Sequence, residues 1–123
     1  MDDPNFVVRT PLHATERRDS VEDAVRSLFP DAEFEEEGGT LVGRSEDPER
    51  LRDLVENQEI HQTVREELAD SVVGNTLVFR LSKQPATVGR LNFAVGGHEL
   101  GALRVRVETD PEDFIGYVTG TEA

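Results

Sequence analysis

Residues 75–107 contain the side chains with the clearest potential for binding chemistry in this chain. The stretch holds five of the thirteen basic residues and one acid, so its net charge is +4, whereas the whole chain carries −13. The basic residues are Arg80, Lys83, Arg90, Arg104 and Arg106. Arginine suits phosphate groups and base edges because its planar guanidinium donates two parallel hydrogen bonds. A basic island in an acidic protein therefore indicates an anionic partner, and RNA is the first hypothesis.

Strand alternation predicts where these arginines point. Alternating apolar residues predict three strands, over about 5–12, 76–82 and 102–108. Because successive side chains in a strand point to opposite faces, Arg80, Arg104 and Arg106 fall opposite the apolar set. Arg9 joins them by the same parity. If the three strands are neighbours, four guanidinium groups share one face of a sheet.

The same arginines also fit a solvated face without a ligand. Arginines on an exposed sheet often pair with acids across strands, and Glu99 or Glu108 could serve. The face also lacks the exposed aromatic side chains on which sheet-based RNA readers stack bases. A third hypothesis is a protein–protein adaptor that pairs through its sheet edge or its basic face. The residues alone leave all three open.

The first half of the chain predicts a helix and a hairpin. An apolar stripe indicates a helix over about 20–29, with Ser20 and Asp23 as a capping box, and Pro30 ends it. Two short alternating stretches then flank Gly38-Gly39, a pair typical of a tight hairpin turn.

The second half predicts more helices and one more strand. The apolar face of residues 48–70 switches sides midway, which predicts two helices with a break near Asn57-Gln58. A strand is expected over 88–93, followed by a turn at Gly96-Gly97-His98. Asp110-Pro111 is typical of a helix start, so a short final helix should follow.

Together these elements predict an α+β fold. Mixed order and hairpin connections favour a two-layer sandwich with a mixed or antiparallel sheet of about five to six strands and helices on one face. At 123 residues the chain fits one domain, residues 1–123.

Composition disfavours most other classes of function. No cysteine is present, and His13, His61 and His98 lack metal-ligand spacing, so no metal site or cofactor is expected. No Gly-rich phosphate loop or activated serine appears, so we expect neither an enzyme nor a small-molecule substrate. No apolar run is long enough for a membrane span and no leader peptide is evident, which indicates a cytoplasmic protein.

The acidic balance bears on the mechanism. Twenty-six acids stand against twelve arginines and one lysine, a pattern that favours a halophilic source. Affinity that depends on charge falls steeply with salt. Hydrogen bonds, shape and stacking would therefore have to contribute to any RNA binding in a salt-rich cell.

One block of the basic stretch resembles a known archaeal family. The block runs through Gly74-Asn75, Lys83-Gln84, Gly89-Arg90 and Leu100-Gly101. It is similar to uncharacterised protein family 0201, and the similarity extends over nearly the whole chain, including Thr10-Pro11 and Phe29-Pro30. Ser82, Pro85 and His98-Glu99 depart from the family pattern.

The resemblance implies a fold and a partner. Such proteins look like the α+β sandwich of the ribosomal protein that holds 5S ribosomal RNA, and relatives are described as predicted RNA-binding, some linked to the exosome. On this pattern Lys83 and Arg90 would hold phosphates, and Gln84 would reach a base edge or a 2′-hydroxyl. The structural positions carried over are Gly74, Asn75, Gly89 and Gly101. A purely structural role for the block, with Lys83-Gln84 fixing the Pro85 loop by hydrogen bonds, remains the alternative.

Overall fold

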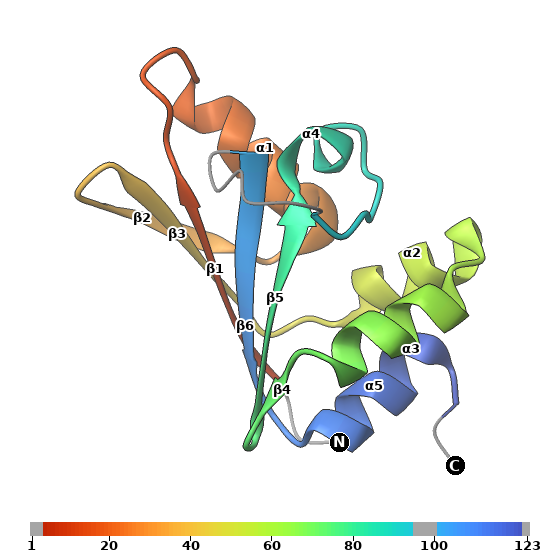
Figure 1. Ribbon diagram of the computed structural model, residues 1–123. Helices are drawn as coiled ribbons and strands as arrows, with labels where there is room; N and C mark the ends of the chain where they lie inside the picture. Colours follow the sequence, from red (N-terminus) through yellow and green to blue (C-terminus); the bar gives the residue numbers. More distant parts are fainter. Residues whose placement is uncertain (1–3, 95–100, 122–123) are drawn as a thin grey trace.

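The computed structural model describes residues 4–94 and 101–121 (Figure 1). Within them a six-stranded antiparallel sheet is covered on one side by helices, which confirms the predicted α+β sandwich. The strands are β1 (Asn5–Pro11), β2 (Glu33–Glu37), β3 (Thr40–Ser45), β4 (Val72–Val73), β5 (Thr76–Ser82) and β6 (Ala102–Glu108). The helices are α1 (Arg18–Leu28), α2 (Glu49–Gln58), α3 (His61–Ala69), α4 (Lys83–Ala86) and α5 (Pro111–Thr119).

The order of the strands brings distant parts of the chain together. The sheet runs β2-β3-β1-β6-β5-β4, so β1 pairs with both β3 and β6. The three strands that carry the predicted arginine face, β1, β6 and β5, are therefore direct neighbours (Figure 1). The side of the sheet without helices is called the open face below.

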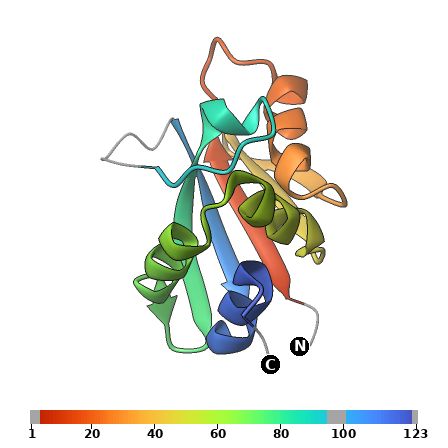
Figure 2. The same ribbon diagram turned by 90° about the vertical axis from the view of Figure 1, so that its right-hand side faces the viewer.

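The helical layer has two parts. Helix α1 packs with α4 at one end of the sheet, and α5 packs with α2 and α3 at the other. Figure 2 looks onto this layer and shows α2, α3, α4 and α5 in front of the strands. Inward residues of β1, β5 and β6 meet the apolar stripes of these helices in one core. Phe6 lies at its centre, with ring centroids 4.9 Å from Phe29 and 5.7 Å from Phe114.

Several local predictions are confirmed. Helix α2 ends at Gln58, Glu59 adopts a left-handed conformation with φ 55°, and α3 starts two residues later, so the predicted break is real. Asp110 caps α5 by accepting a hydrogen bond from the Asp113 backbone N–H at 3.0 Å. Gly38 and Gly39 both have positive φ, which a two-residue hairpin turn of this kind requires.

Three details differ from prediction. The capping box is wrong, because α1 begins at Arg18 and its N-cap Arg17 makes no side-chain cap bond. The strand predicted over 88–93 is reduced to a single bridge, in which Phe93 pairs with Leu81 of β5. The Gln58 side chain takes both backbone groups of Leu91, at 2.8 and 3.0 Å, which a strand would have used for a ladder. Strand β4 was not predicted, because two residues give no alternation to detect. The expected turn at 96–98 lies outside the described residues.

No helix in the described part of the chain is both long and apolar enough to cross a membrane.

Candidate nucleic-acid interface

The open face carries three arginines side by side. Arg104 of β6 lies directly opposite Arg9 of β1 on one side and Arg80 of β5 on the other. These three residues, called the arginine row below, cross the central strands at a single level of the sheet. Neighbouring strands are about 4.8 Å apart, so the row places three cationic stems within about 10 Å. Arg106 lies two residues further along β6, on the same face.

Two arginines of the row have no acidic partner among the described residues. Arg9 and Arg104 are exposed, and within residues 4–94 and 101–121 neither has an acidic side chain within ion-pair distance. Of the two acids expected to pair there, Glu108 lies 3.5 Å from Arg106, and Glu99 is outside the described residues. Like charges directly opposite one another destabilise a sheet. An anion bound over the row would remove this repulsion.

Two acidic residues of the same face lie at its β2 edge. Glu33 and Glu35 of β2 pair with β3 residues that also face away from the core. Arg44 of β3 is neutralised there by Glu35, at 2.8 Å. The basic part of the open face is therefore confined to β1, β6 and β5, and it ends where β3 and β2 begin.

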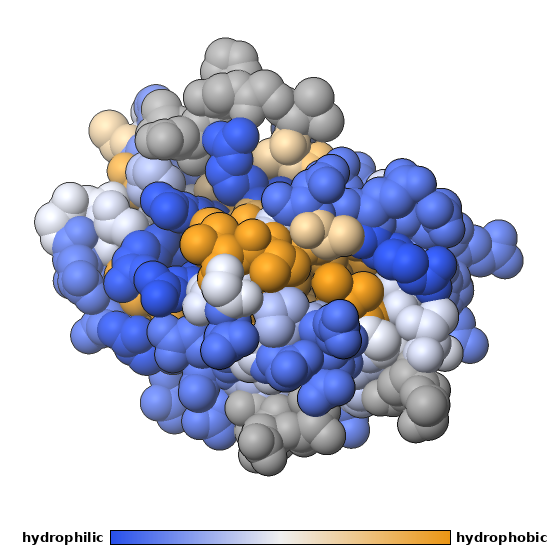
Figure 3. Space-filling view, turned by 60° about the horizontal axis from the view of Figure 1, so that its bottom comes forward, coloured by the Kyte–Doolittle hydropathy of each residue, from blue (hydrophilic) through white to orange (hydrophobic). Residues whose placement is uncertain are grey.

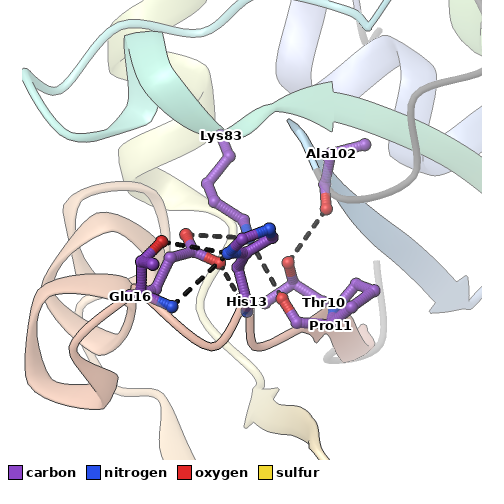
Figure 4. A network of polar contacts seen from close by, with 7 residues as sticks. Thr10, Pro11, His13, Glu16, Lys83 and Ala102 are labelled. Atoms are coloured by element: carbon purple, nitrogen blue, oxygen red, sulfur yellow. Dashed lines mark hydrogen bonds and ion pairs between the residues drawn. The ribbon is translucent and has the colours of Figure 1, made fainter.

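Lys83 lies inside the protein rather than on a binding surface. Its side chain is buried, and its ammonium group donates to the Pro11 carbonyl at 3.1 Å and to both Glu16 carboxylate oxygens at 3.1 and 3.2 Å (Figure 4). Glu16 Oε1 also accepts a hydrogen bond from the backbone N–H of His13. The lysine thus ties the loop before α1 to the start of α4. A phosphate contact by Lys83 would require breaking this ion pair.

Glu16 gives the network a pH dependence. Burial by itself raises the pKa of Glu16, but the His13 backbone N–H and the Lys83 ammonium outweigh burial, and the pKa lies below its usual range. A depressed carboxyl pKa contributes stability above the unfolded-state pKa, and this contribution is lost as pH falls through the folded-state value.

We therefore expect the stability advantage of the parent protein over Glu16→Gln to be full at pH 7 and to shrink below about pH 4. Urea unfolding of both proteins across this pH range measures the difference. Comparing the pair cancels most of the acid response of the other carboxylates. An advantage that stays constant down to pH 3 would contradict the assigned role of Glu16.

The other loop residues lie on the helical side. Gln84 and Arg90 are exposed, but their segment is fixed to the helices. Ser27 of α1 donates to the Ala86 carbonyl at 2.6 Å, and Gln58 of α2 holds Leu91. Figure 2 shows α4 and its following loop in front of the sheet, whereas the arginine row is behind it. The sheet therefore separates the two halves of the predicted basic site.

The signature glycines divide into two kinds. Gly74 has φ 62° in the turn before β5, next to the exposed Asn75, and Gly89 has φ 72° in the turn after α4. Side chains other than glycine are strained at such angles. Gly101 has no positive φ, and among the described residues a Cβ there would meet no neighbour. No backbone reason for glycine at position 101 follows from its surroundings.

A second surface feature lies at the β4 edge. Val72 and Val73 are 39% and 67% exposed, and the outer side of β4 has no partner strand in the described part of the chain. Figure 3 shows an apolar patch, surrounded by hydrophilic residues, on the side of the molecule that is lowest in Figure 1, where β4 lies. An unpaired edge of this kind can accept a strand from another chain.

Comparison with known proteins covers nearly the whole chain. A family model described as RNA binding matches residues 5–109, which include every strand of the sheet. A UPF0200/UPF0201 protein of Archaeoglobus fulgidus is 39% identical over 115 residues. The chain belongs to the UPF0201 family. The resemblance found in the Lys83–Arg90 block is therefore confirmed at the level of the family.

Other UPF0201 proteins extend the comparison. One from Methanocaldococcus jannaschii is 29% identical over 114 residues, 89% of this chain. A UPF0201 crystal structure superposes with a TM-score of 0.88 at 33% identity, covering 97% of this chain and 94% of that one. The match to the A. fulgidus relative covers 90% of this chain but only 36% of that protein's length. The match to the M. jannaschii relative covers 66% of that protein's length.

Within residues 4–94 and 101–121, no three acidic or histidine side chains gather where they could hold a metal ion. His13 contacts Thr15 at 3.0 Å in the loop before α1, and His61 begins α3. The family description names no enzymatic activity. The arginine row is the feature of the described surface that best fits a binding function.

Proposed function

We propose that this UPF0201 protein binds RNA through the open face of β1, β6 and β5. The observation that carries the proposal is the arginine row, in which Arg104 stands directly between Arg9 and Arg80. The description of the family as RNA binding supports the same conclusion. Arg9 and Arg104 stand directly opposite each other, and the repulsion between them would be relieved by a bound phosphate.

The contacts follow from the layout of charge. The arginine row would donate to backbone phosphates, and Arg106, partly neutralised by Glu108, would extend the surface along β6. The acidic β2 edge repels phosphates, so the bound strand would be kept over the three central strands. Binding needs no chemical step, so the proposed role is non-enzymatic.

The acidic composition adds a condition to this proposal. The acidic composition favours a halophilic source with a salt-rich cytoplasm. In such a cytoplasm counterion release contributes little to RNA affinity. Guanidinium groups would then act mainly through directed hydrogen bonds, which salt weakens less than it weakens long-range attraction. Binding measurements should therefore extend to molar potassium chloride.

Replacing Arg9 and Arg104 together by glutamine is expected to weaken RNA binding at least about tenfold, because each lost charge-assisted hydrogen bond costs about 1.5–3 kcal/mol. The slope of log affinity against log salt should also become shallower by about 1.4, or about 0.7 for each lost phosphate contact. Fluorescence anisotropy with a labelled short single-stranded RNA, from low to molar salt, measures both. A 5S ribosomal RNA probe tests the ribosomal partner that the family resemblance implies.

A matched control makes the same charge change on the helical side. The variant Arg65→Gln/Arg90→Gln should bind within about twofold of the parent, since neither residue lies on the open face. Thermal melting should show that Arg9→Gln/Arg104→Gln remains folded. Equal losses in both double variants, or no RNA binding by the parent at any salt concentration, would contradict the proposal.

The exposed valines of β4 favour a second candidate, an adaptor that pairs through this edge. The same purified protein separates the two candidates. The adaptor would be favoured by a protein partner that remains bound after nuclease treatment. The variant Arg9→Gln/Arg104→Gln should then bind this protein partner as well as the parent does.

A further inference from the structure

The arginine row borders a hollow in the open face. The hollow has a volume of about 460 Å³, within the usual range of small-ligand pockets. Among the described residues its lining includes Arg9, Arg80, Arg104, Pro11, Thr40 and Ala102. The hollow is therefore both cationic on one side and large enough for a group bigger than a single ion.

The shape of the hollow follows from the sheet register. Beyond the arginine row, the next level of the sheet carries short side chains, with Thr40 opposite Pro11 and Ala102 opposite Ser82. Three long arginines next to a level of short residues leave a depression with the guanidinium groups at its border. The hydroxyl of Thr40 lies on this lining as a further hydrogen-bond donor.

The charge of the hollow favours a dianion over a monoanion. Within the described residues, neither Arg9 nor Arg104 has an acidic partner. An internal phosphate of an RNA strand carries one negative charge, whereas a phosphate monoester carries between −1.5 and −2 at pH 7 and presents three strong acceptor oxygens. A monoester therefore matches the guanidinium groups of Arg9 and Arg104 on this lining better.

The border that the arginine row forms on one side of the hollow fits the end of a chain. A strand that continues past an internal phosphate must leave a site in two directions. A terminal nucleotide can place its phosphate against the arginines and needs to leave in one direction only, away from the row that borders the hollow.

We propose that this hollow binds a phosphate monoester, either the end phosphate of an RNA strand or that of a free mononucleotide. For an RNA end, the inference rests on the RNA binding proposed above. For a mononucleotide it stands independently, because the same arginines and the same hollow would recognise the same group.

Two pairs of ligands test the inference on the full chain. The first pair is one short RNA sequence with a hydroxyl or a phosphate at its end, prepared for the 5′ and the 3′ end separately. The second pair is adenosine and adenosine monophosphate, used as competitors. A phosphate-ended RNA that binds about tenfold tighter than its hydroxyl-ended twin is the expected result for an RNA end. The hollow would instead be assigned to mononucleotides if adenosine monophosphate competes with RNA and adenosine does not, while phosphate-ended and hydroxyl-ended RNAs bind equally well.

A variant that fills the hollow separates this inference from general RNA binding. Thr40→Met removes the hydroxyl and occupies space but keeps every arginine, so it should reduce the phosphate preference to less than about twofold while hydroxyl-ended RNA still binds. The matched control is Thr76→Met, on the open face of β5 at the opposite end of the sheet, which should keep the preference. Fluorescence anisotropy with the same RNA pairs measures both variants.

The outcomes keep the two proposals distinguishable. Equal affinity for every phosphate and hydroxyl pair, with RNA still bound, overturns the hollow but leaves the RNA-binding function intact. Binding of adenosine monophosphate without any RNA binding overturns that function and supports the hollow. A preference that Thr40→Met leaves unchanged would also overturn the assignment to this hollow.

Discussion

Replacing Phe6 with alanine is expected to lower the free energy of unfolding by about 3–5 kcal/mol, the usual cost of truncating a buried phenylalanine. Phe6 is 1% exposed, and its ring contacts those of Phe29 and Phe114. Phe29 directly follows α1 and Phe114 lies in α5, so Phe6 joins both parts of the helical layer to β1. The cavity left by alanine would reach both parts. Urea unfolding monitored by circular dichroism measures the loss.

A control on the same strand separates burial from strand effects. Val7 lies next to Phe6 but faces the open side and is only half-buried. Val7→Ala should therefore cost less than about 1 kcal/mol, because little apolar surface is lost from a packed site. A cost for Phe6→Ala no greater than that for Val7→Ala would contradict the assigned centre of the core.

The direction of the arginines could be predicted from sequence, but their register could not. Alternation in β1, β5 and β6 fixes which face each side chain takes. It says nothing about which strands are neighbours or which residues stand opposite. Arg9 and Arg104 are 95 positions apart in the chain, and only the strand order places them in one row. The hollow depends on the same register, so it had no local signal either.

The position of Lys83 shows the opposite limit. Lysine is almost never fully buried unless it is paired, so a lysine in a basic stretch is expected to face solvent. Its partner Glu16 is 67 residues earlier, in a loop whose sequence predicts only a turn. Lys83 makes structural hydrogen bonds, as in the alternative stated from sequence, but its partners lie in the distant loop before α1 and not in the Pro85 loop.

The shortening of the strand predicted over 88–93 to one bridge has a related cause. Leu91 and Phe93 alternate with polar residues as in a strand, and both pack toward the core. At Leu91 the backbone is satisfied by a side chain instead of a ladder, since Gln58 bonds both of its polar groups. Pairing with β5 begins only at Phe93, which bridges to Leu81. Periodicity indicates that alternate residues are buried. It cannot show whether the backbone groups between them bond to a side chain or to a neighbouring strand.

Replacing Glu16 with alanine is expected to destabilise the fold by about 3 kcal/mol, because it leaves the buried Lys83 ammonium without its counter-charge. The Pro11 carbonyl alone would remain as its acceptor. Adding Lys83→Met removes the stranded charge and keeps an apolar side chain of similar length. The double variant should therefore be more stable than Glu16→Ala alone, although it carries one more substitution. Urea unfolding of the four proteins gives the coupling energy between the two positions.

The surface pair Arg44–Glu35 is a useful comparison, because it is shorter, at 2.8 Å, but both side chains are 53% exposed. Glu35→Ala should cost less than about 1 kcal/mol. The double variant Glu16→Ala/Lys83→Met also tests the interface, since its RNA affinity should stay within about twofold of the parent if Lys83 has only a structural role. A double variant less stable than Glu16→Ala would disprove the stranded-charge argument. A large loss of RNA affinity in a folded double variant would instead indicate that Lys83 takes part in RNA binding.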